Sequence, residues 1–176
     1  MEAVVRDIQT STPGGFEDFF RSEYPVVVRI ATNVLRDAHL AEDIAQDAMI
    51  AARRRFDDPG GSEHAVAWVK TAAAHLALNA LRDRRRLEDR HRRVRTDHAQ
   101  AGPEELLLER EDSARVRVAL SRLPARAAMV LVLRHSGLGY AEVAEAMGVS
   151  VGAIGTMLRR AEAALRKEVE KDAPRT

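Results

Sequence analysis

Apolar residues recur three and four positions apart along most of the chain, the spacing that lines one face of an α-helix. The first such stretch comprises Phe16, Phe19, Phe20, Tyr24, Val27, Ala31, Val34 and Leu35. Pro25 lies inside this stretch. Because proline removes a backbone hydrogen bond and clashes with the preceding turn, the sequence predicts a kink or a break there.

A second helix is predicted from about Ala38 to near Phe56, with Asp37 as its N-terminal cap. Its inner face carries Leu40, Ile44, Ala48 and Ala52. The run Asp-Asp-Pro-Gly-Gly at 57–61 has the composition of a turn. After it, Ser62 is suited to cap a third helix, which carries Trp68 on its apolar stripe, and we expect that side chain to be core.

The polar segment 88–103 predicts an exposed linker, and apolar periodicity returns after it. Pro124 is expected to start a helix, followed by a short helix at 140–147 and a longer one at 151–170. Aromatic residues make up only 4% of the chain, which favours helices over sheets. We therefore expect an all-α protein of two small helical domains joined by a flexible linker. The expected division is a tail at 1–15, a three-to-four-helix bundle at 16–87, a linker and connecting helix at 88–116, a helix-turn-helix at 117–170 and a tail at 171–176.

Several classes of function are disfavoured by the composition. The chain has no cysteine, which excludes disulfides, thiolate zinc sites and a cysteine nucleophile. The six histidines lack metal-ligand spacing, and we find neither a nucleophile beside a base nor a glycine-rich phosphate loop. We therefore expect no enzyme, no metal, no cofactor and no small-molecule ligand. No apolar run approaches membrane-spanning length, so we expect a cytoplasmic protein without membrane insertion.

Basic residues are concentrated in the middle of a chain whose overall charge is nearly balanced, with 28 basic against 27 acidic residues. Arginine occupies positions 82, 84, 85, 86, 90, 92, 93 and 95, against only three acidic residues between Arg82 and Arg95. Such a run is either a solvated helix end or a surface that binds phosphates. The charge pattern alone leaves both interpretations open.

The C-terminal part has the requirements of a helix-turn-helix. Ala144 is small enough for the two helices to touch, and Gly148 can take the positive φ of a tight turn. Ile154 is placed to anchor the second helix, and Ser150 is placed to cap it. An ordinary helix pair with a glycine turn has the same pattern, but the basic residues Arg159 and Arg160 and the upstream helix favour DNA binding.

Two ordered sets of motifs carry a family resemblance. The segments Leu-Ser-Arg-Leu-Pro-Ala-Arg at 120–126, Val-Leu-Val-Leu-Arg at 130–134, the run 140–152 and the run 158–166 resemble region 4 of extracytoplasmic-function (ECF) sigma factors of the sigma-70 family. Ala-Glu-Asp-Ile-Ala-Gln-Asp-Ala at 41–48, Ala-Trp-Val at 67–69 and Leu-Arg-Asp-Arg-Arg-Arg at 81–86 resemble region 2. The resemblance implies a dissociable RNA polymerase subunit that directs transcription initiation at promoter DNA and is held by an anti-sigma factor.

The resemblance also implies a role for each matched position. Core polymerase would be bound by Glu42, Asp43, Gln46, Asp47 and Ile50. The −10 element would be bound and melted by Phe56, Asp57, Asp58, His64, His75, Asn79, Arg82, Arg84, Arg85 and Arg86. The −35 element would be read by Tyr140, Ser150, Val151, Ala153, Thr156, Met157, Arg159 and Arg160.

The chain departs from the family pattern in both regions. Ala74, His75 and Asn79 stand where the family commonly has an arginine, an asparagine and an aspartate. Gly155 and Met157 stand where it usually has basic residues, which leaves few base-reading donors. One hypothesis is an unusual −35 element; another is weaker dependence on DNA. The competing classes are a dimeric helix-turn-helix regulator independent of polymerase and a sigma-like protein that acts through protein contacts.

Overall fold

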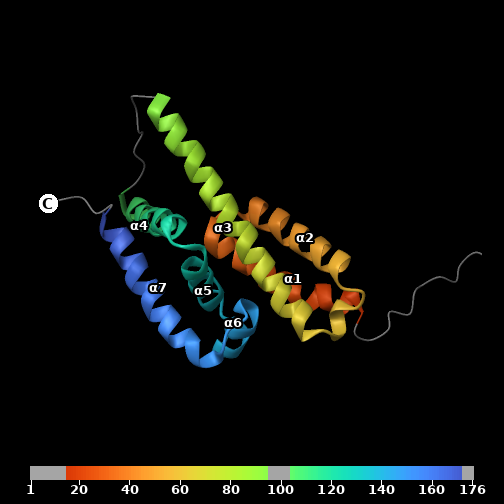
Figure 1. The fold of residues 1–176 in the computed structure, drawn as a ribbon. Helices are drawn as coiled ribbons and strands as arrows, with labels where there is room; N and C mark the ends of the chain where they lie inside the picture. Colours follow the sequence, from red (N-terminus) through yellow and green to blue (C-terminus); the bar gives the residue numbers. More distant parts are fainter. Residues whose placement is uncertain (1–14, 95–103, 172–176) are drawn as a thin grey trace, which may run out of the picture.

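The computed structural model describes residues 15–94 and 104–171, and within these ranges it contains helices and no strands (Figure 1). The elements are α1 (Phe16–Leu35), α2 (Ala38–Arg55), the short 3-10 helix η1 (Pro59–Gly61), α3 (Glu63–Val94), α4 (Glu104–Arg122), α5 (Ala125–His135), α6 (Tyr140–Met147) and α7 (Val151–Lys171). Residues 1–14 and 172–176, which make up most of the tails expected at 1–15 and 171–176, and the linker residues 95–103 lie outside the described residues.

Helix α1 is continuous through Pro25, so of the two predicted outcomes the break is wrong and the kink stays a prediction. Pro25 is exposed, and water can hydrogen-bond the carbonyl that the missing amide leaves free. The predicted start of α2 is confirmed, because the Asp37 carboxylate accepts a hydrogen bond of 3.2 Å from the amide of Leu40. Between the two helices, Arg36 takes a left-handed conformation with φ 56°.

Helix α3 is capped as predicted, since the Ser62 hydroxyl oxygen accepts a hydrogen bond from the amide of Ala65. The helix continues to Val94, well into the segment where we expected the linker. Trp68 is half-buried and packs against the core rather than lying wholly within it. Ladders of alanine line the contacts among α1, α2 and α3, and these small side chains let the helices approach closely. The buried alanines of these three helices are Ala31, Ala41, Ala45, Ala48, Ala52, Ala65, Ala67, Ala73, Ala74 and Ala77.

The helix-turn-helix of α6 and α7 is built as predicted. Gly148 has φ 63° at the end of α6, and Ala144 and Ile154 are buried where the two helices meet. The predicted cap by the Ser150 hydroxyl is not found among the described residues; the Ser150 carbonyl instead accepts from the amide of Ala153. The hydroxyl therefore stays available at the start of α7.

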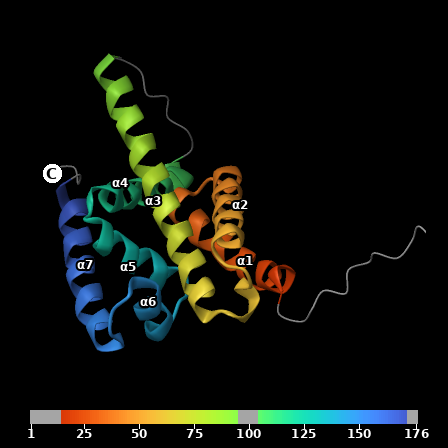
Figure 2. The same ribbon diagram turned by 45° about the vertical axis from the view of Figure 1, so that its right-hand side comes forward.

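The two halves of the chain pack against each other along α3. This helix contacts α1 and α2 on one side and α4, α5 and α6 on the other, and both views show it running between the two groups (Figures 1 and 2). One cluster of buried apolar side chains extends from α1 through α3 into α5, α6 and α7. The sequence left the relative orientation of the halves open, and the structure joins them through a shared core.

Polar contacts follow the same boundary. Lys70 on α3 is only 7% exposed, and its ammonium lies 3.0 Å from the Glu142 carboxylate on α6 and 3.7 Å from Glu23 on α1. The pKa of Glu142 is lowered, because the amide of Gly139 and the Lys70 ammonium stabilise its charged form. A second set of contacts crosses between α1 and the end of α5, where the Arg29 guanidinium donates to the Ser136 carbonyl at 3.0 Å.

No single helix in the described ranges is long and apolar enough to cross a membrane. The pair α6 and α7 reaches that length and composition only when the two are taken together, and they are bent by 89° at their turn.

The glycines of the helix-turn-helix predict opposite responses to alanine. Gly148→Ala forces a side chain into the left-handed region and should lower the free energy of unfolding by about 1 kcal/mol. Gly155→Ala should raise it by about 0.5–1 kcal/mol, because a Cβ there meets only Tyr140, at 4.0 Å, and alanine favours the helix. Urea denaturation of the two variants measures both changes. A loss of stability in Gly155→Ala would show that the contact with Tyr140 is too tight for a methyl group.

Lys70→Met should destabilise the protein by about 3 kcal/mol, because it leaves the mostly buried Glu23 carboxylate without its cation. Adding Glu23→Gln should recover most of that loss, since the uncompensated charge is then gone. Thermal denaturation of the single and double variants measures the coupling. Additive losses in the double variant would contradict a charge interaction between these residues.

Candidate nucleic-acid interface

Helix α7 packs mainly against α4, α5 and α6 and leaves one face exposed. Ser150, Val151, Thr156, Arg159 and Arg160 are all exposed on it or at its start. Tyr140 is 46% exposed at the start of α6, and the Arg134 guanidinium lies 5.7 Å from its ring centroid. The structure thus brings most of the predicted −35 residues together on one accessible surface.

Two predicted −35 residues are less accessible than the others. Ala153 and Met157 are half-buried, and Met157 packs against the hydrophobic core. A side chain held in this way offers little apolar surface to a thymine methyl group. The exposed polar groups of this surface that can reach a base are the hydroxyls of Ser150 and Thr156 and the guanidiniums of Arg159 and Arg160.

The loop between α2 and α3 is organised by an aromatic cluster. The Phe56 ring lies 5.9 Å from that of His64 and 5.8 Å from that of Trp68, both edge to face. The Arg55 guanidinium lies 5.6 Å from the Trp68 ring centroid. The neighbouring Asp57 and Asp58 are exposed. The loop therefore places flat side chains next to polar edges, the combination that holds an unstacked base.

The outer surface of α3 carries His75 and Asn79, which are both exposed and lie one helical turn apart. Further along, Arg86 is exposed and its guanidinium pairs with Asp83 at 3.2 Å. Arg84 is exposed on another side of the helix and pairs with Glu88 at 3.3 Å. The predicted −10 residues of α3 therefore do not form one surface.

Arg82 and Arg85 are turned towards α4. The Arg82 guanidinium donates to the Ser121 and Leu123 carbonyls at 3.4 and 3.3 Å. Arg85 donates to the Val118 carbonyl at 3.1 Å and to the Ser121 hydroxyl at 2.9 Å. Carbonyls at a helix C-terminus lack partners within the helix and carry partial negative charge. In this arrangement the two arginines therefore donate hydrogen bonds to oxygens in the last turn of α4 and just after it.

Helix α2 carries the predicted polymerase-binding residues on one exposed face, opposite its alanine ladder. These are Glu42, Asp43, Gln46, Asp47 and Ile50, and Ile50 is 49% exposed. A groove of about 570 Å³ adjoins this face. Its apolar lining includes Phe16 and Phe20 of α1 and Met49 of α2. The face therefore joins acidic groups to an open apolar surface, a combination suited to a protein partner.

Two features of these surfaces escaped the sequence analysis. The arginines that cap α4 gave no local signal, because their partners lie more than thirty positions away in the chain. We assigned Phe16 and Phe20 to the core stripe of α1, yet they line the groove and Phe20 is 38% exposed. Their position four residues apart at the very start of the helix was the only sequence signal for an exposed end.

Comparisons with known families agree with the two halves of the structure. The model of sigma-70 region 2 matches residues 19–87, and that of sigma-70 region 4 matches residues 113–165. The first match covers α2 and most of α1 and α3, and the second covers the second half of α4, all of α5 and α6 and most of α7.

Curated relatives match along nearly the full chain. The ECF RNA polymerase sigma factor SigD of Mycobacterium bovis is 30% identical over 179 residues, covering 96% of this chain and 84% of the relative. The RNA polymerase sigma factor YlaC of Bacillus subtilis is 27% identical over 161 residues, covering 88% of this chain and 92% of the relative.

Solved structures share the fold. CnrH, solved in complex with the cytosolic domain of CnrY, matches with a TM-score of 0.54 and 23% identity, covering 90% of this chain and 89% of that one. The sigma factor RpoE, solved with the anti-sigma factor NepR from Bartonella quintana, matches with a TM-score of 0.50 and 22% identity, covering 90% of this chain and 98% of that one. The chain therefore belongs to the ECF RNA polymerase sigma factors of the sigma-70 family.

Proposed function

We propose that this protein binds core RNA polymerase in the cytoplasm and directs it to promoters, and that it performs no catalysis itself. In this proposal the domain at 16–87 binds polymerase and opens the −10 element, and the domain at 117–170 binds the −35 element. The observation that carries the proposal is the pairing, in one chain, of the exposed α2 face beside its groove with a helix-turn-helix whose α7 is exposed. A dimeric regulator that ignores polymerase accounts only for the second of these surfaces.

The proposed function requires the packed halves to separate. The −10 and −35 elements are centred about 25 base pairs apart, or roughly 85 Å at ~3.4 Å per base pair. The longest helix, α3, has 32 residues. At ~1.5 Å per residue it extends only about 48 Å. We infer that the contacts between α3 and the C-terminal helices open when the protein engages polymerase and promoter.

Separation of the two halves also changes which groups the arginines of α3 can bind. While the halves are packed, Arg82 and Arg85 are held by the carbonyls at the end of α4. Once α4 moves away, their guanidiniums are free to bind phosphates beside the melted −10 element, together with Arg84 and Arg86. The base-contacting groups in this proposal are the Phe56 to His64 loop and the exposed pair His75 and Asn79.

An anti-sigma factor is the partner we propose for the packed arrangement. Both solved relatives named above were captured with an inhibitory or cytosolic partner chain. In this protein the groove beside α2 is an apolar surface on which such a chain can lie without separating the halves. Occupation of the groove would compete directly with polymerase for the α2 face.

A second function is favoured by one observation. Gly155 and the half-buried Met157 leave α7 with few groups that can read bases. A protein with this helix can act mainly through polymerase or an inhibitor, with little dependence on a −35 element. Footprinting of the protein with polymerase on its own promoter separates the two functions. An opened −10 element without any protection of the −35 element supports action that depends little on −35 recognition.

Asp43→Arg combined with Asp47→Arg should weaken binding to core polymerase by about tenfold or more, because it reverses the charge of the α2 face. Both residues are exposed, so folding should be unaffected. Glu162→Arg combined with Glu170→Arg is the matched control, since it reverses two exposed charges on α7. Fluorescence anisotropy with labelled protein measures the affinities. Equal weakening in the control would indicate a general charge effect and contradict a specific α2 interface.

Arg159→Ala should reduce −35 binding by about tenfold to a hundredfold, since a bidentate arginine contact to a base contributes roughly 1–3 kcal/mol of discrimination. Arg166→Ala removes the same charge two turns further along α7 and should weaken binding evenly across promoter sequences. DNase footprints of holoenzyme on wild-type and −35-substituted promoters measure both effects. Unchanged protection in Arg159→Ala would contradict base reading by this side chain.

A further inference from the structure

A small cavity lies between the two halves of the molecule, beside the last turns of α3 that α4 covers. It has a volume of about 150 Å³ and is lined from the end of α1, from α3 and from α4. Three of its lining residues are arginines, Arg84 and Arg85 of α3 and Arg117 of α4, and Glu88 is the one carboxylate among them. The cavity therefore carries excess positive charge.

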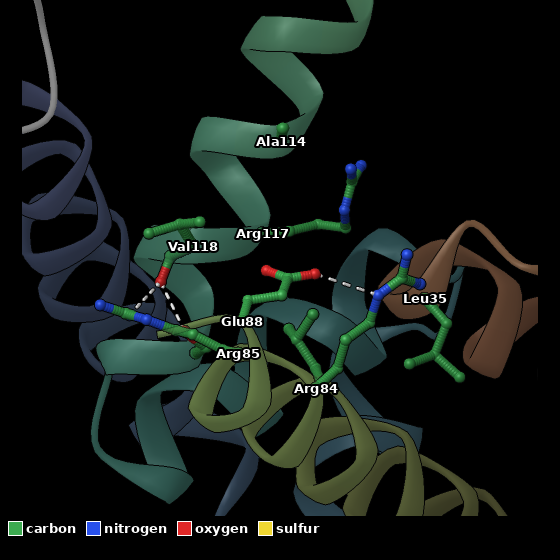
Figure 3. Close-up of a pocket in the computed structure, with 9 residues that line it drawn as sticks. Leu35, Arg84, Arg85, Glu88, Ala114, Arg117 and Val118 are labelled. Atoms are coloured by element: carbon green, nitrogen blue, oxygen red, sulfur yellow. Dashed lines mark hydrogen bonds and ion pairs between the residues drawn. The ribbon is translucent and has the colours of Figure 1, made fainter. Parts of the chain in front are cut away.

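Arg117 is the unsatisfied member of this group. Glu88 pairs with Arg84, and Arg85 is held by the Val118 carbonyl and the Ser121 hydroxyl. Figure 3 shows these contacts as dashed lines and none reaching Arg117, whose side chain extends from α4 over the cavity. Among the described residues Arg117 has no hydrogen bond or ion pair, although it is half-buried.

The surroundings of Arg117 disfavour its positive charge. Its pKa is lowered, first by burial and then by repulsion from Arg36 and Arg84, and Glu88 offsets this only in part. A guanidinium that has no hydrogen-bonded acceptor, in a cavity lined by three arginines and one carboxylate, is suited to bind an oxyanion.

We propose that this cavity binds a small phosphate anion, of the inorganic phosphate or pyrophosphate class, between Arg84 of α3 and Arg117 of α4. A guanidinium presents several donors in one plane and matches two oxygens of a phosphate group. The cavity has room for one such group or for two linked ones, whereas a DNA duplex is far too wide to enter it. Because the two arginines come from the two sides of the packing boundary, the anion would hold α3 and α4 together.

The site is a property of the packed protein and does not depend on the proposed promoter function. Isothermal titration of the full chain with inorganic phosphate and with pyrophosphate, at an ionic strength kept constant with sodium chloride, tests it directly. We expect saturable one-to-one binding. Arg117→Gln should raise the dissociation constant by about tenfold to a hundredfold, the value of a charged hydrogen-bond pair of roughly 1.5–3 kcal/mol.

Arg115→Gln is the matched control, because it removes an arginine from the same helix that does not line the cavity. It should change the dissociation constant less than about twofold. Arg117→Gln should also raise the melting temperature in chloride buffer, since it removes a repelled charge, while abolishing the further rise that phosphate gives the wild type. A raised melting temperature in chloride buffer, together with no further rise in phosphate, cannot result from a loss of folding.

Two results would overturn the proposal. One is wild-type binding of phosphate and pyrophosphate that is no tighter than binding of chloride. The other is an equal loss of affinity in Arg115→Gln and Arg117→Gln, which would indicate general attraction to a basic surface. Titration with ADP then identifies the source of the anion: binding equal to that of pyrophosphate indicates the diphosphate end of a nucleotide, and binding only of pyrophosphate indicates the inorganic ion.

Discussion

Helix α3 has to satisfy two sets of neighbours at once, and the rest of the structure depends on how it does so. Its alanine-rich side packs into α1 and α2, where small residues allow close approach. Its other side meets α4, α5 and α6 through the shared apolar core and also through polar groups, among them Lys70, Arg82 and Arg85. The polar contacts can be replaced by contacts with water, phosphate or another chain at a modest cost in free energy.

The arginines of α3 illustrate that exchange. Each hydrogen bond from a guanidinium to a carbonyl at the end of α4 contributes on the order of 1.5–3 kcal/mol, and a DNA phosphate offers a comparable acceptor. The same side chains can therefore stabilise the packed arrangement and later bind nucleic acid, but not at the same time. Salt weakens contacts with phosphates more than it weakens a partly buried pair such as Lys70 with Glu142, so ionic strength should shift the balance between the two arrangements.

The helix-turn-helix divides its residues between support and recognition. Ala144, Gly148 and Ile154 build the turn and its core, and Met157, which has the position of a reading residue, also packs inward. Recognition is left to few groups on α7, which places more of the functional demand on α2, on the loop after it and on the outer surface of α3. The groove lined by Phe16, Phe20 and Met49 adds an open apolar surface to that half.

The sequence by itself determined the helices, the Asp37 and Ser62 caps, the turn at Gly148 and the family, because each depends on spacing or on residues close together in the chain. It also placed the residues predicted to bind polymerase on one side of α2, since burial of the opposite face follows from periodicity. Only the tertiary structure decided that α1 continues through Pro25, that the halves share a core, and that Arg82 and Arg85 cap α4 while Arg117 stays unpaired. The helix continues through Pro25 because that turn faces solvent, and the other outcomes depend on partners tens of residues away. A local pattern of charge or hydrophobicity does not indicate which distant group will meet it.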